Sequence, residues 1–408
     1  MRLYDLYNSK AHSIIPTLER IQSAVKYLGL KPSYSSFQVG GTNGKGSTCA
    51  FLNSILLSHG YKVGWFISPH LIDETERWRI NSEPISEQDL GIFIKELKPI
   101  FERFELTYFE ACTLIALSYF EEKKVDFAIF EVGMGGRWDA TRVCSPVACA
   151  ITNIQRDHIK WLGEKSSQRA LEKLGIYIQG RPLVLGSMRF PLYPLALEVC
   201  NQSDLIVGGL DFFAQGKIDG SKTLLESFEF NSFKLKNVRL GLWGEWQIEN
   251  CAVSIALASS ILKLSEKEVS KALETTRWEG RMELIREKPA IFLDGAHNPD
   301  AIFSLCKALK THFPNITPVF SSLKDKEWKN SLKAVSLFFK ELYITQINHH
   351  RALNLEELKL ACDELGIFCH CLESPSEILN LDKDIVVFGS LYLVGEVRSI
   401  IKSFGGHK

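Results

Sequence analysis

The sequence predicts an α/β protein with two domains, and three observations lead to this prediction. Short β-branched or apolar runs alternate with segments of helical period from residue 37 to about residue 210, as in strand-helix units around a mainly parallel sheet. The same alternation starts again near residue 290. The chain of 408 residues is also too long for one comfortable hydrophobic core.

The first domain is predicted to span residues 1–285. Its expected strands are Phe37–Gly40, Val63–Ile67, Phe127–Val132, Val147–Asn153, Pro182–Leu185 and Leu205–Val207. Its expected helices are Ser47–Ser58, Glu87–Phe101, Phe109–Lys123, Ser166–Ile178 and Gln247–Leu262. Two runs, Thr223–Phe230 and Phe233–Leu242, flank the turn signal Asn231-Ser232 and predict an attached β-hairpin.

The second domain is predicted to span residues 286–408 as a compact Rossmann-like α/β unit. Its expected strands are Ala290–Leu293, Pro318–Ser321, Leu342–Thr345, a run near Phe368, and Ile385–Phe388. Its expected helices are Asp300–His312, Ser331–Lys340 and Leu355–Leu365. The segment lacks the Gly-x-Gly-x-x-Gly fingerprint, so a dinucleotide is not expected there.

Composition limits the partners that we expect. The 48 basic and 48 acidic side chains give no net charge, so nothing favours a nucleic acid or a membrane surface. The N-terminus has no apolar core of signal-peptide length and no later run approaches a membrane span, which favours the cytoplasm.

The cysteines are scattered along the chain, as expected for buried thiols in a reducing compartment. The triplet Cys369-His370-Cys371 is more typical of strand packing than of a metal site.

Residues 40–48 form a glycine-rich loop, Gly-Gly-Thr-Asn-Gly-Lys-Gly-Ser-Thr, between the first strand and the first helix. The glycines let backbone N–H groups converge on phosphate oxygens, and the helix N-terminus adds its positive dipole end. Lys45 supplies a charge, and Ser47 or Thr48 offers a hydroxyl to Mg²⁺. The loop predicts nucleoside triphosphate binding, with a spacing that differs from the common P-loop.

Two predicted strands carry polar side chains at their carboxyl ends. Glu131 follows one strand and precedes a glycine-rich run. A carboxylate at the carboxyl end of a parallel strand, beside a phosphate-binding loop, is where enzymes that use nucleoside triphosphates hold Mg²⁺ or polarise a nucleophile. An exposed glutamate before a turn is the alternative. Asp157 and His158 follow the strand that ends at Asn153. The imidazole suits a metal and the carboxylate can orient it, whereas a surface histidine is the alternative.

Three further segments are candidates for chemistry. Ser68 follows a strand and offers a hydroxyl to Mg²⁺, with a plain Ser-Pro turn as the alternative. Lys173, taken by itself, is typical of a solvated helix lysine. The run Asp294-Gly-Ala-His-Asn-Pro299 ends the first strand of the second domain with more polar residues than packing requires, and Asn298-Pro299 predicts a helix start.

Taken in order, these segments resemble the folylpolyglutamate synthase and dihydrofolate synthase family, a branch of the Mur ligase superfamily. The matching motifs are Gly41-Thr-Asn-Gly-Lys-Gly-Ser47, Ser68-Pro-His-Leu71, Glu76-Arg-x-Arg-Ile-Asn81, Thr107-x-Phe-Glu110, Glu131-Val-Gly-x-Gly-Gly-Arg-x-Asp-Ala-Thr141, Asp157-His158, Glu172-Lys-x-Gly-Ile176, Asp294-Gly-Ala-His-Asn-Pro299 and Gly389-Ser-Leu-Tyr392. They span nearly the whole chain. The resemblance implies an N-terminal P-loop ATPase-like domain and a smaller C-terminal glutamate-ligase domain.

The resemblance implies an ATP-dependent carboxylate-amine ligase. ATP would phosphorylate a carboxylate, the amine of L-glutamate would attack the acyl phosphate, and phosphate would leave. The acceptor would be 7,8-dihydropteroate (dihydrofolate synthase) or the γ-carboxyl of a reduced folate (folylpolyglutamate synthase). A Mur enzyme acting on a cell-wall precursor is the alternative among ligases, and a GTP-binding switch, for which the chain lacks an Asn-Lys-x-Asp motif, is the alternative from another class.

By position, the resemblance also implies site residues. Expected ATP contacts are Gly41, Thr42, Asn43, Gly44, Lys45, Gly46, Ser47, Thr48, Asn250, Arg281, Asp294 and His297. Expected Mg²⁺ ligands are Ser68, Glu131, His158 and Lys173, with two ions and a carbamylated Lys173 bridging to one of them. Lys45, Lys173 and His158 are the expected catalytic residues. Expected pterin or folate contacts are Thr107, Tyr108, Phe109, Glu110, Trp138, Asp139, Ala140 and Asp157.

Three places depart from the usual family pattern. Gln155-Arg156 precede Asp157 where a small residue and leucine are common, and this change bears on the pterin pocket. Trp246 replaces a frequent histidine on the adenine side, and Leu174 replaces alanine. The phosphate and metal residues keep the pattern, and one active site per chain makes a monomer sufficient.

Overall fold

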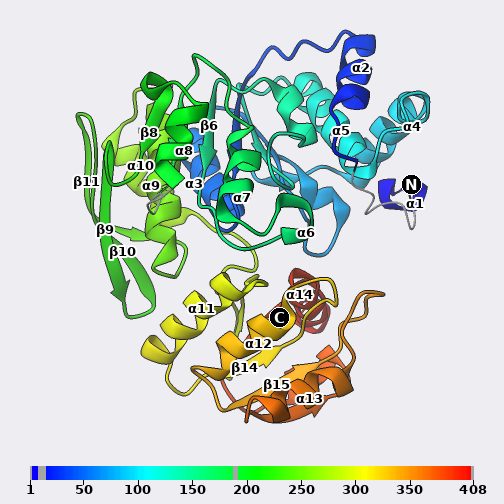
Figure 1. Ribbon diagram of the computed structural model, residues 1–408, viewed down its shortest axis with the longest axis vertical. Coiled ribbons are helices and arrows are strands. Elements are labelled where there is room, and N and C mark those ends of the chain that lie inside the picture. The colour runs from blue at the N-terminus through cyan, green and yellow to red at the C-terminus, as the bar shows by residue number, and fades with distance from the viewer. Residues whose placement is uncertain (1, 8–14, 187–191, 406–408) are drawn as a thin grey trace. The chain divides into compact units, whose positions relative to one another are not determined.

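The computed structural model describes residues 2–7, 15–186 and 192–405. Contacts divide the chain into two compact units. The first unit takes the chain up to Ile154 together with Ile159–Gly241 and Trp246–Arg277, and the second holds Gln155–His158, Leu242–Glu245 and the chain from Trp278. Each unit is built of helices packed on a mostly parallel sheet, which confirms the predicted α/β class (Figure 1).

The first unit contains a mixed, mostly parallel sheet. Among the described residues its eight strands have the order β4-β3-β2-β5-β1-β6-β7-β8. Six strands lie where they were predicted: β1 (Ser35–Gly40), β2 (Val63–Phe66), β5 (Phe127–Glu131), β6 (Ala148–Ile151), β7 (Leu183–Leu185) and β8 (Leu205–Val207). The antiparallel strands β3 (Trp78–Ile80) and β4 (Glu83–Pro84), at one end of the sheet, were not predicted, because segments of three and two residues carry too little pattern.

Helices cover this sheet. They are α1 (Leu3–Tyr7), α2 (Glu19–Leu28), α3 (Lys45–Ser58), α4 (Glu87–Arg103), α5 (Tyr108–Glu122), α6 (Ile159–Leu162), α7 (Ser166–Leu174), α8 (Leu192–Val199), α9 (Trp246–Ser259) and α10 (Glu266–Thr275). The helix α3 packs against α9 and α10 as well as against β1, β2 and β5. It is therefore buried on most sides, as a helix with apolar residues around its circumference should be. No described helix is long and apolar enough to cross a membrane.

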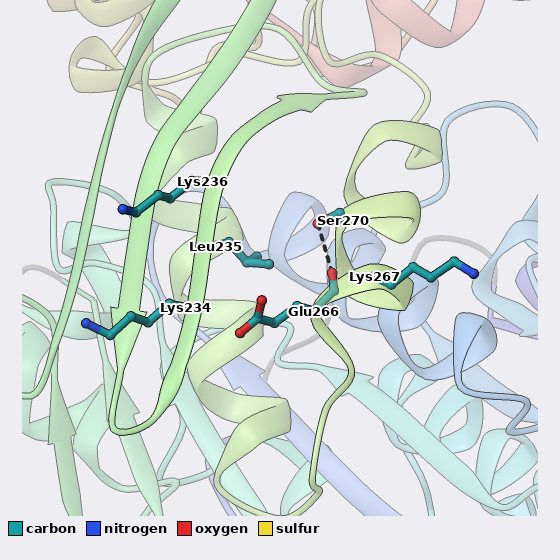
Figure 2. A pocket seen from close by; sticks show the side chains of 6 residues that line it. All are labelled: Lys234, Leu235, Lys236, Glu266, Lys267 and Ser270. Carbon is teal, nitrogen blue, oxygen red and sulfur yellow. Dashed lines mark hydrogen bonds between the residues drawn. The ribbon is translucent and has the colours of Figure 1, made fainter.

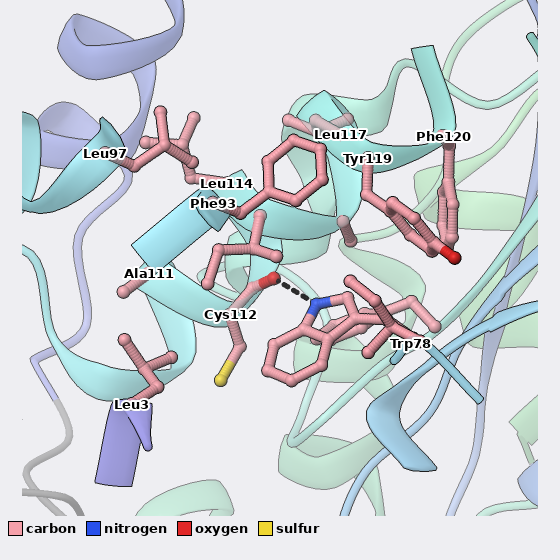
Figure 3. Packing of buried hydrophobic residues seen from close by; sticks show 14 of the residues in the cluster. Leu3, Trp78, Phe93, Leu97, Ala111, Cys112, Leu114, Leu117, Tyr119 and Phe120 are labelled. Atoms are coloured by element: carbon pink, nitrogen blue, oxygen red, sulfur yellow. Dashed lines mark hydrogen bonds between the residues drawn. The ribbon is translucent and has the colours of Figure 1, made fainter. Parts of the chain in front are cut away.

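One hydrophobic cluster fixes the helices that surround α5 (Figure 3). Leu3 of α1, Phe93 of α4 and Phe120 of α5 are all in it, together with Phe66 and Phe130 from the sheet. The indole of Trp78 donates a hydrogen bond of 2.9 Å to the Cys112 carbonyl, so its polar atom is satisfied inside the cluster. This packing sets where the N-terminus of α5 lies.

The predicted hairpin is part of a three-stranded antiparallel sheet. Its strands are β9 (Phe212–Asp219), β10 (Lys222–Phe230) and β11 (Phe233–Leu240). The pair β10-β11 confirms the prediction, with Phe230 and Phe233 as the last paired residues before the turn. The strand β9 was missed, because two of its inward positions carry Ala214 and Gly216, which give little apolar signal.

The second unit contains a six-stranded sheet, counted among the described residues, in the order β12-β13-β17-β14-β15-β16. Its strands are β12 (Glu283–Glu287), β13 (Ala290–Leu293), β14 (Thr317–Phe320), β15 (Glu341–Thr345), β16 (Phe368–Leu372) and β17 (Ile385–Phe388). All pairs are parallel except β12-β13. Its helices are α11 (Pro299–His312), α12 (Trp328–Ser336), α13 (Leu355–Glu364) and α14 (Leu391–Gly405). The predicted start of α11 is confirmed, because the Asn298 side chain caps the helix through the Ala301 N–H.

Candidate active site

The glycine-rich loop connects β1 to α3, as predicted. Gly44 is the residue before the helix and has a φ of 85°, and Gly41 has a φ of 139°. A Cβ atom on Gly41 would lie 1.9 Å from the Thr152 hydroxyl, and one on Gly44 would lie 2.1 Å from the Asn250 side-chain oxygen. Glycine is therefore required at both positions, by conformation and by space.

The end of β6 holds this loop in place. The Thr42 N–H donates to the Asn153 carbonyl (3.0 Å), and the Asn43 N–H donates to the Asn153 side-chain oxygen (3.0 Å). In return, the Asn153 amide and the Thr152 hydroxyl donate to the Asn43 carbonyl at 2.9 and 2.6 Å. Asn153 was not predicted to have a role, although a polar residue at the carboxyl end of a parallel strand was a signal for one.

Two lysines meet at one carbonyl of the loop. The Lys45 Nζ lies 3.4 Å from the Gly41 oxygen and 3.3 Å from the Thr42 oxygen. The Lys173 Nζ, from α7, donates to the same Gly41 oxygen at 2.8 Å, and its residue is only 3% exposed. Lys173 is thus a buried residue at the loop, not the solvated helix lysine that its position alone suggested.

Asn250 supports the loop from α9. Its backbone oxygen accepts a hydrogen bond from the Thr48 hydroxyl (3.4 Å), and its side-chain amide donates to Gln247 (2.9 Å). The side-chain oxygen of Asn250 faces Gly44. The structure therefore brings Asn250 to the start of α3, beside the predicted phosphate-binding residues.

Glu131 and Ser68 come together at the carboxyl ends of adjacent strands. Glu131 ends β5, is 6% exposed, and accepts a 3.2 Å hydrogen bond from the Ser68 N–H. Its strand pairs in parallel with β1, and its register partner is Val39, the residue directly before the glycine-rich loop. Ser68 and Glu131, two of the three predicted metal ligands of the first unit, are thus neighbours of each other and of the loop.

Asp139 organises the turn that follows Glu131. Its carboxylate accepts hydrogen bonds of 3.0 Å from the N–H groups of Gly133, Met134 and Thr141, and a further one from the Thr141 hydroxyl. Burial raises the pKa of Asp139, while these hydrogen bonds act in the opposite direction by favouring the charged form. The side chain therefore shapes the Gly-x-Gly-Gly turn, a role that the motif did not reveal.

Replacing Asp139 by asparagine is expected to lower the free energy of unfolding by about 1–3 kcal/mol, because the amide would face N–H or hydroxyl donors with a donor of its own. Turnover should fall together with stability, because the turn that Asp139 shapes directly follows Glu131, a predicted metal ligand. Urea unfolding and a turnover assay on the same preparation measure both. Asp219→Asn, an exposed position on β9, is the matched control. A stability equal to that of the control would contradict the role given to Asp139.

Glu110, in the first turn of α5, accepts hydrogen bonds from the residue that caps this helix. The Thr107 N–H and hydroxyl donate to Glu110 Oε2 at 2.7 and 2.8 Å, and Thr107 caps the helix in return. Arg20 of α2 adds an ion pair of 3.0 Å to the same oxygen. The other oxygen, Glu110 Oε1, is buried and has no hydrogen-bond partner among the described residues. Glu110 thus joins α2 to α5 and keeps one buried acceptor.

The remaining predicted pterin contacts differ in their exposure. Tyr108 packs edge-on against Tyr4 and Tyr7 of α1, with ring centroids 5.9 and 5.8 Å apart. Phe109 lies against the turn after Glu131, because a Cβ on Gly133 would be 2.7 Å from its ring. Trp138 is 50% exposed, whereas Ala140 is buried. Among these side chains, Trp138 offers the most open aromatic surface.

Asp157 is the centre of an ion cluster in the second unit. Lys326 lies 3.1 Å from its carboxylate, His297 3.6 Å and His158 3.7 Å. Burial alone would raise the pKa of Asp157, but the hydrogen bond from His297 and the charges of Lys326 and His158 hold it well below its usual range. Lys326 was not predicted as part of the site, because a lysine after a short strand carries no signal of its partner.

Asp294, Arg281 and His297 also lie together in the second unit. The Asp294 carboxylate accepts hydrogen bonds from the N–H groups of Met282 (3.0 Å) and Ala296 (2.9 Å), and burial raises its pKa. A Cβ on Gly295 would lie 2.1 Å from Arg281 Nη1, and the His297 Nδ1 lies 2.8 Å from the Gly295 oxygen. The strand end thus groups three of the predicted nucleotide residues.

A shallow pocket on the first unit contains none of the predicted residues (Figure 2). It lies between β11 and α10 and is lined by Lys234, Leu235, Lys236, Glu266, Lys267 and Ser270. The Ser270 hydroxyl is bound to the Glu266 carbonyl of its own helix at 2.8 Å. With Lys234 paired to Glu229, the pocket is an exposed hollow of mixed charge.

Comparisons with known proteins identify two known domains in the chain. Residues 39–168 match the Mur ligase middle domain, and residues 280–392 match the Mur ligase glutamate ligase domain. The dihydrofolate synthase/folylpolyglutamate synthase of Bacillus subtilis is 32% identical over 415 residues, covering 95% of both chains. The Escherichia coli protein of the same name is 29% identical and covers 97% of this chain and 94% of its own.

Solved structures show the same fold. The folylpolyglutamate synthase of Mycobacterium tuberculosis, complexed with ADP and AMPPCP, has a TM-score of 0.91 at 26% identity and covers 98% of this chain and 97% of its own. Escherichia coli FolC in complex with DHPP and ADP has a TM-score of 0.89 at 29% identity, covering 99% and 97%. A Yersinia pestis bifunctional enzyme complexed with AMPPNP and a manganese ion has a TM-score of 0.86 at 28% identity, covering 98% of each chain.

Proposed function

Because this chain belongs to the dihydrofolate synthase/folylpolyglutamate synthase family of the Mur ligase superfamily, we propose how its own residues activate a carboxylate for attack by L-glutamate. The chain is an ATP-dependent glutamate ligase of the Mur type. The pterin-type acceptor and the role of each residue are the parts that we propose. The observation that carries the proposal is the convergence of Lys45 and Lys173 on the Gly41 carbonyl of the phosphate loop.

The loop residues Gly41 to Thr48 bind the ATP phosphates in this proposal. Backbone N–H groups at the start of α3 point to phosphate oxygens, and the helix dipole favours the anion. Lys45 neutralises charge on the phosphoryl group as it is transferred to the substrate carboxylate. Asn250 keeps the first turn of α3 in place, and Arg281, Asp294 and His297 are the proposed nucleotide contacts of the second unit.

Ser68 and Glu131 fit a divalent cation. A hydroxyl and a carboxylate are oxygen ligands of the kind that Mg²⁺ prefers, and the Ser68 N–H already lies 3.2 Å from Glu131. We propose His158 as a third ligand. When bound, the metal supplies positive charge to the phosphate oxygens. A second ion would need another anion, which carbamylation of the Lys173 amine by CO₂, with release of a proton, would create.

The acceptor is proposed to be dihydropteroate or a reduced folate. DHPP is the ligand in the related Escherichia coli structure, which supports a pterin at the equivalent residues here. The proposed contacts are Thr107 to Glu110, Trp138 to Ala140, and Asp157. The exposed ring of Trp138 can stack on a planar heterocycle. We also propose a monomer in the cytoplasm, with residues 1–285 and 286–408 as its two domains.

Glutamate-dependent phosphate release tests this proposal. Purified protein is incubated with ATP, Mg²⁺ and L-glutamate, and with either dihydropteroate or a reduced folate. Release with each acceptor, and much less with GTP in place of ATP, is expected. No product with dihydropteroate would remove the first activity, and a product with a nucleotide-linked cell-wall precursor instead would overturn the folate assignment.

A further inference from the structure

The segment Gln155–His158 belongs by its contacts to the second unit, although the chain before and after it belongs to the first. It follows β6 and precedes α6. Two of its residues have proposed roles in the reaction: Asp157 as an acceptor contact and His158 as the third metal ligand. The contacts that hold these four residues in place therefore bear on the reaction.

The charges of this segment match those of a second dipeptide. Arg156 Nε lies 2.9 and 3.0 Å from the two carboxylate oxygens of Glu327. Beside this contact, Asp157 Oδ1 lies 3.1 Å from Lys326 Nζ. The dipeptides Arg156-Asp157 and Lys326-Glu327 thus pair in antiparallel order, with opposite charges facing at both positions. A shift by one residue would bring like charges together, so the pairing fixes the register of the segment.

The starts of two helices support this pairing. Glu327 directly precedes α12, and its Oε1 also accepts a hydrogen bond of 3.2 Å from Asn330 in the first turn of that helix. Asp300, in the first turn of α11, accepts the Arg156 N–H at 3.2 Å. The helices α11 and α12 pack against each other (Figure 1). Arg156 is therefore held through its backbone and its side chain by carboxylates that helix dipoles favour.

His158 depends on such support, because its backbone is strained. Its φ is 51°, in the left-handed region that residues other than glycine seldom adopt. Its N–H donates to Asp157 Oδ1 at 2.8 Å, and the Asp157 carboxylate is in turn paired with Lys326 and His297. A residue keeps a strained conformation only where the surrounding contacts determine it. The ties of Arg156 and Asp157 supply those contacts.

Arg156 stands where leucine is common in the family, and a leucine cannot form an ion pair. Its side chain is 49% exposed and that of Glu327 is 20% exposed. An ion pair with this much exposure adds little to the stability of a whole protein. Its effect is therefore expected in the local conformation of the segment and not in the stability of the fold.

We propose that Arg156 is a positioning residue of the ligase reaction. Paired with Glu327, it holds the segment in the conformation in which the His158 imidazole can bind the metal ion. The assignment rests on the proposed function, since the metal role of His158 is taken from it. Arg156 acts through His158 and is assigned no contact with a substrate. Its loss should therefore weaken metal binding without removing a reacting group.

Arg156→Glu tests this role, because it removes the attraction to Glu327 and adds repulsion. The dissociation constant of Mn²⁺ is measured by electron paramagnetic resonance with a non-hydrolysable ATP analogue present. It is expected to rise by roughly 10-fold, since each partly exposed charge interaction contributes a factor of up to about 5. Turnover at limiting Mg²⁺ should fall by a similar factor and recover as Mg²⁺ is raised. The KM for L-glutamate and the thermal unfolding temperature should stay near wild type.

Further variants show whether the effect passes through the pair and through His158. The charge swap Arg156→Glu/Glu327→Arg should recover part of the Mn²⁺ affinity. Arg156→Lys should keep most of it, because the contact to Glu327 comes from a single nitrogen. In a His158→Ala background, Arg156→Glu should have no additional effect on Mn²⁺ binding, as expected for two residues that act as one unit.

Lys383→Ala is the matched control. Lys383 forms an ion pair of 3.2 Å with Glu341 in the same unit, and its side chain is 47% exposed, close to the value for Arg156. The control should match wild type in Mn²⁺ affinity and in turnover. Hydrogen exchange of the peptide that spans residues 154–160 measures the anchoring without the reaction. The Arg156 and His158 amides should exchange faster in Arg156→Glu than in the control.

The outcomes separate the positioning role from the activity. If wild-type protein shows no glutamate-dependent phosphate release, the proposed function fails, while hydrogen exchange still shows whether Arg156 holds the segment. If the wild type is active and Arg156→Glu changes neither the Mn²⁺ affinity nor turnover at limiting Mg²⁺, the positioning role alone is overturned. Equal losses of Mn²⁺ affinity with and without the His158 imidazole would also overturn it.

Discussion

Replacing Lys45 by alanine is expected to lower glutamate-dependent ATP turnover by roughly 10²- to 10³-fold, as when one preorganised charge-stabilising group is removed from an active site. Lys45 is the first residue of α3 and its ammonium group lies at the Gly41 and Thr42 carbonyls. Without it, negative charge on the transferring phosphoryl group would be met by backbone dipoles and metal alone. Steady-state phosphate release measures the effect.

Lys222→Ala is the control for this variant, since Lys222 is an exposed lysine of β10 in the same unit. It should keep full turnover. Thermal unfolding of both proteins shows whether the fold is intact. Wild-type turnover in a folded Lys45→Ala protein would remove the lysine from phosphoryl transfer and leave the loop with a structural role only.

Replacing Lys173 by alanine should give the second largest effect, a loss of turnover of about 10²-fold with ATP binding retained. The lysine reaches the Gly41 carbonyl from α7 and is almost fully buried, so the variant loses a charged group at the proposed phosphate loop. ATP binding persists because Lys45 and the loop N–H groups remain. Turnover and equilibrium binding of a non-hydrolysable ATP analogue are measured together.

Small-molecule rescue distinguishes the two chemical forms of Lys173. If the working form is a carbamate, acetate or formate should restore part of the turnover of Lys173→Ala, because it returns carboxylate oxygens to the space. If the working form is the ammonium group, methylammonium should do so instead. Turnover equal to wild type in the alanine variant, with no added ion, would exclude Lys173 from the reaction.

Local patterns made much of the fold predictable. The apolar runs that became β1, β5 and β6 are short and bounded by turn residues, and the Asn298-Pro299 pair marked the start of α11. The glycine-rich loop was equally local, because its conformation depends on glycines at fixed positions. Each of these signals lies within a few neighbouring residues, which is the range that a single sequence reveals.

Contacts between distant residues were not predictable in the same way. The donors to Gly41 come from Lys45 and from Lys173, which is 132 residues away, and no pattern near Lys173 shows its target. Lys326 pairs with Asp157 across 169 residues. The hydrogen bonds from Gly133 and Met134 to the Asp139 carboxylate were not foreseen either. Such partners depend on how strands are ordered, which the chain order does not give.

The four hydrogen bonds between the end of β6 and the glycine-rich loop have a consequence for affinity. Thr152 and Asn153 fix the backbone of Thr42 and Asn43 through the sheet itself. The cradle is therefore preorganised: its shape is part of the folded state, and nucleotide binding loses little conformational entropy in that backbone. Natural variation at residues 152 and 153 should thus tune how tightly the protein retains nucleotide, although neither residue belongs to the phosphate-binding motif.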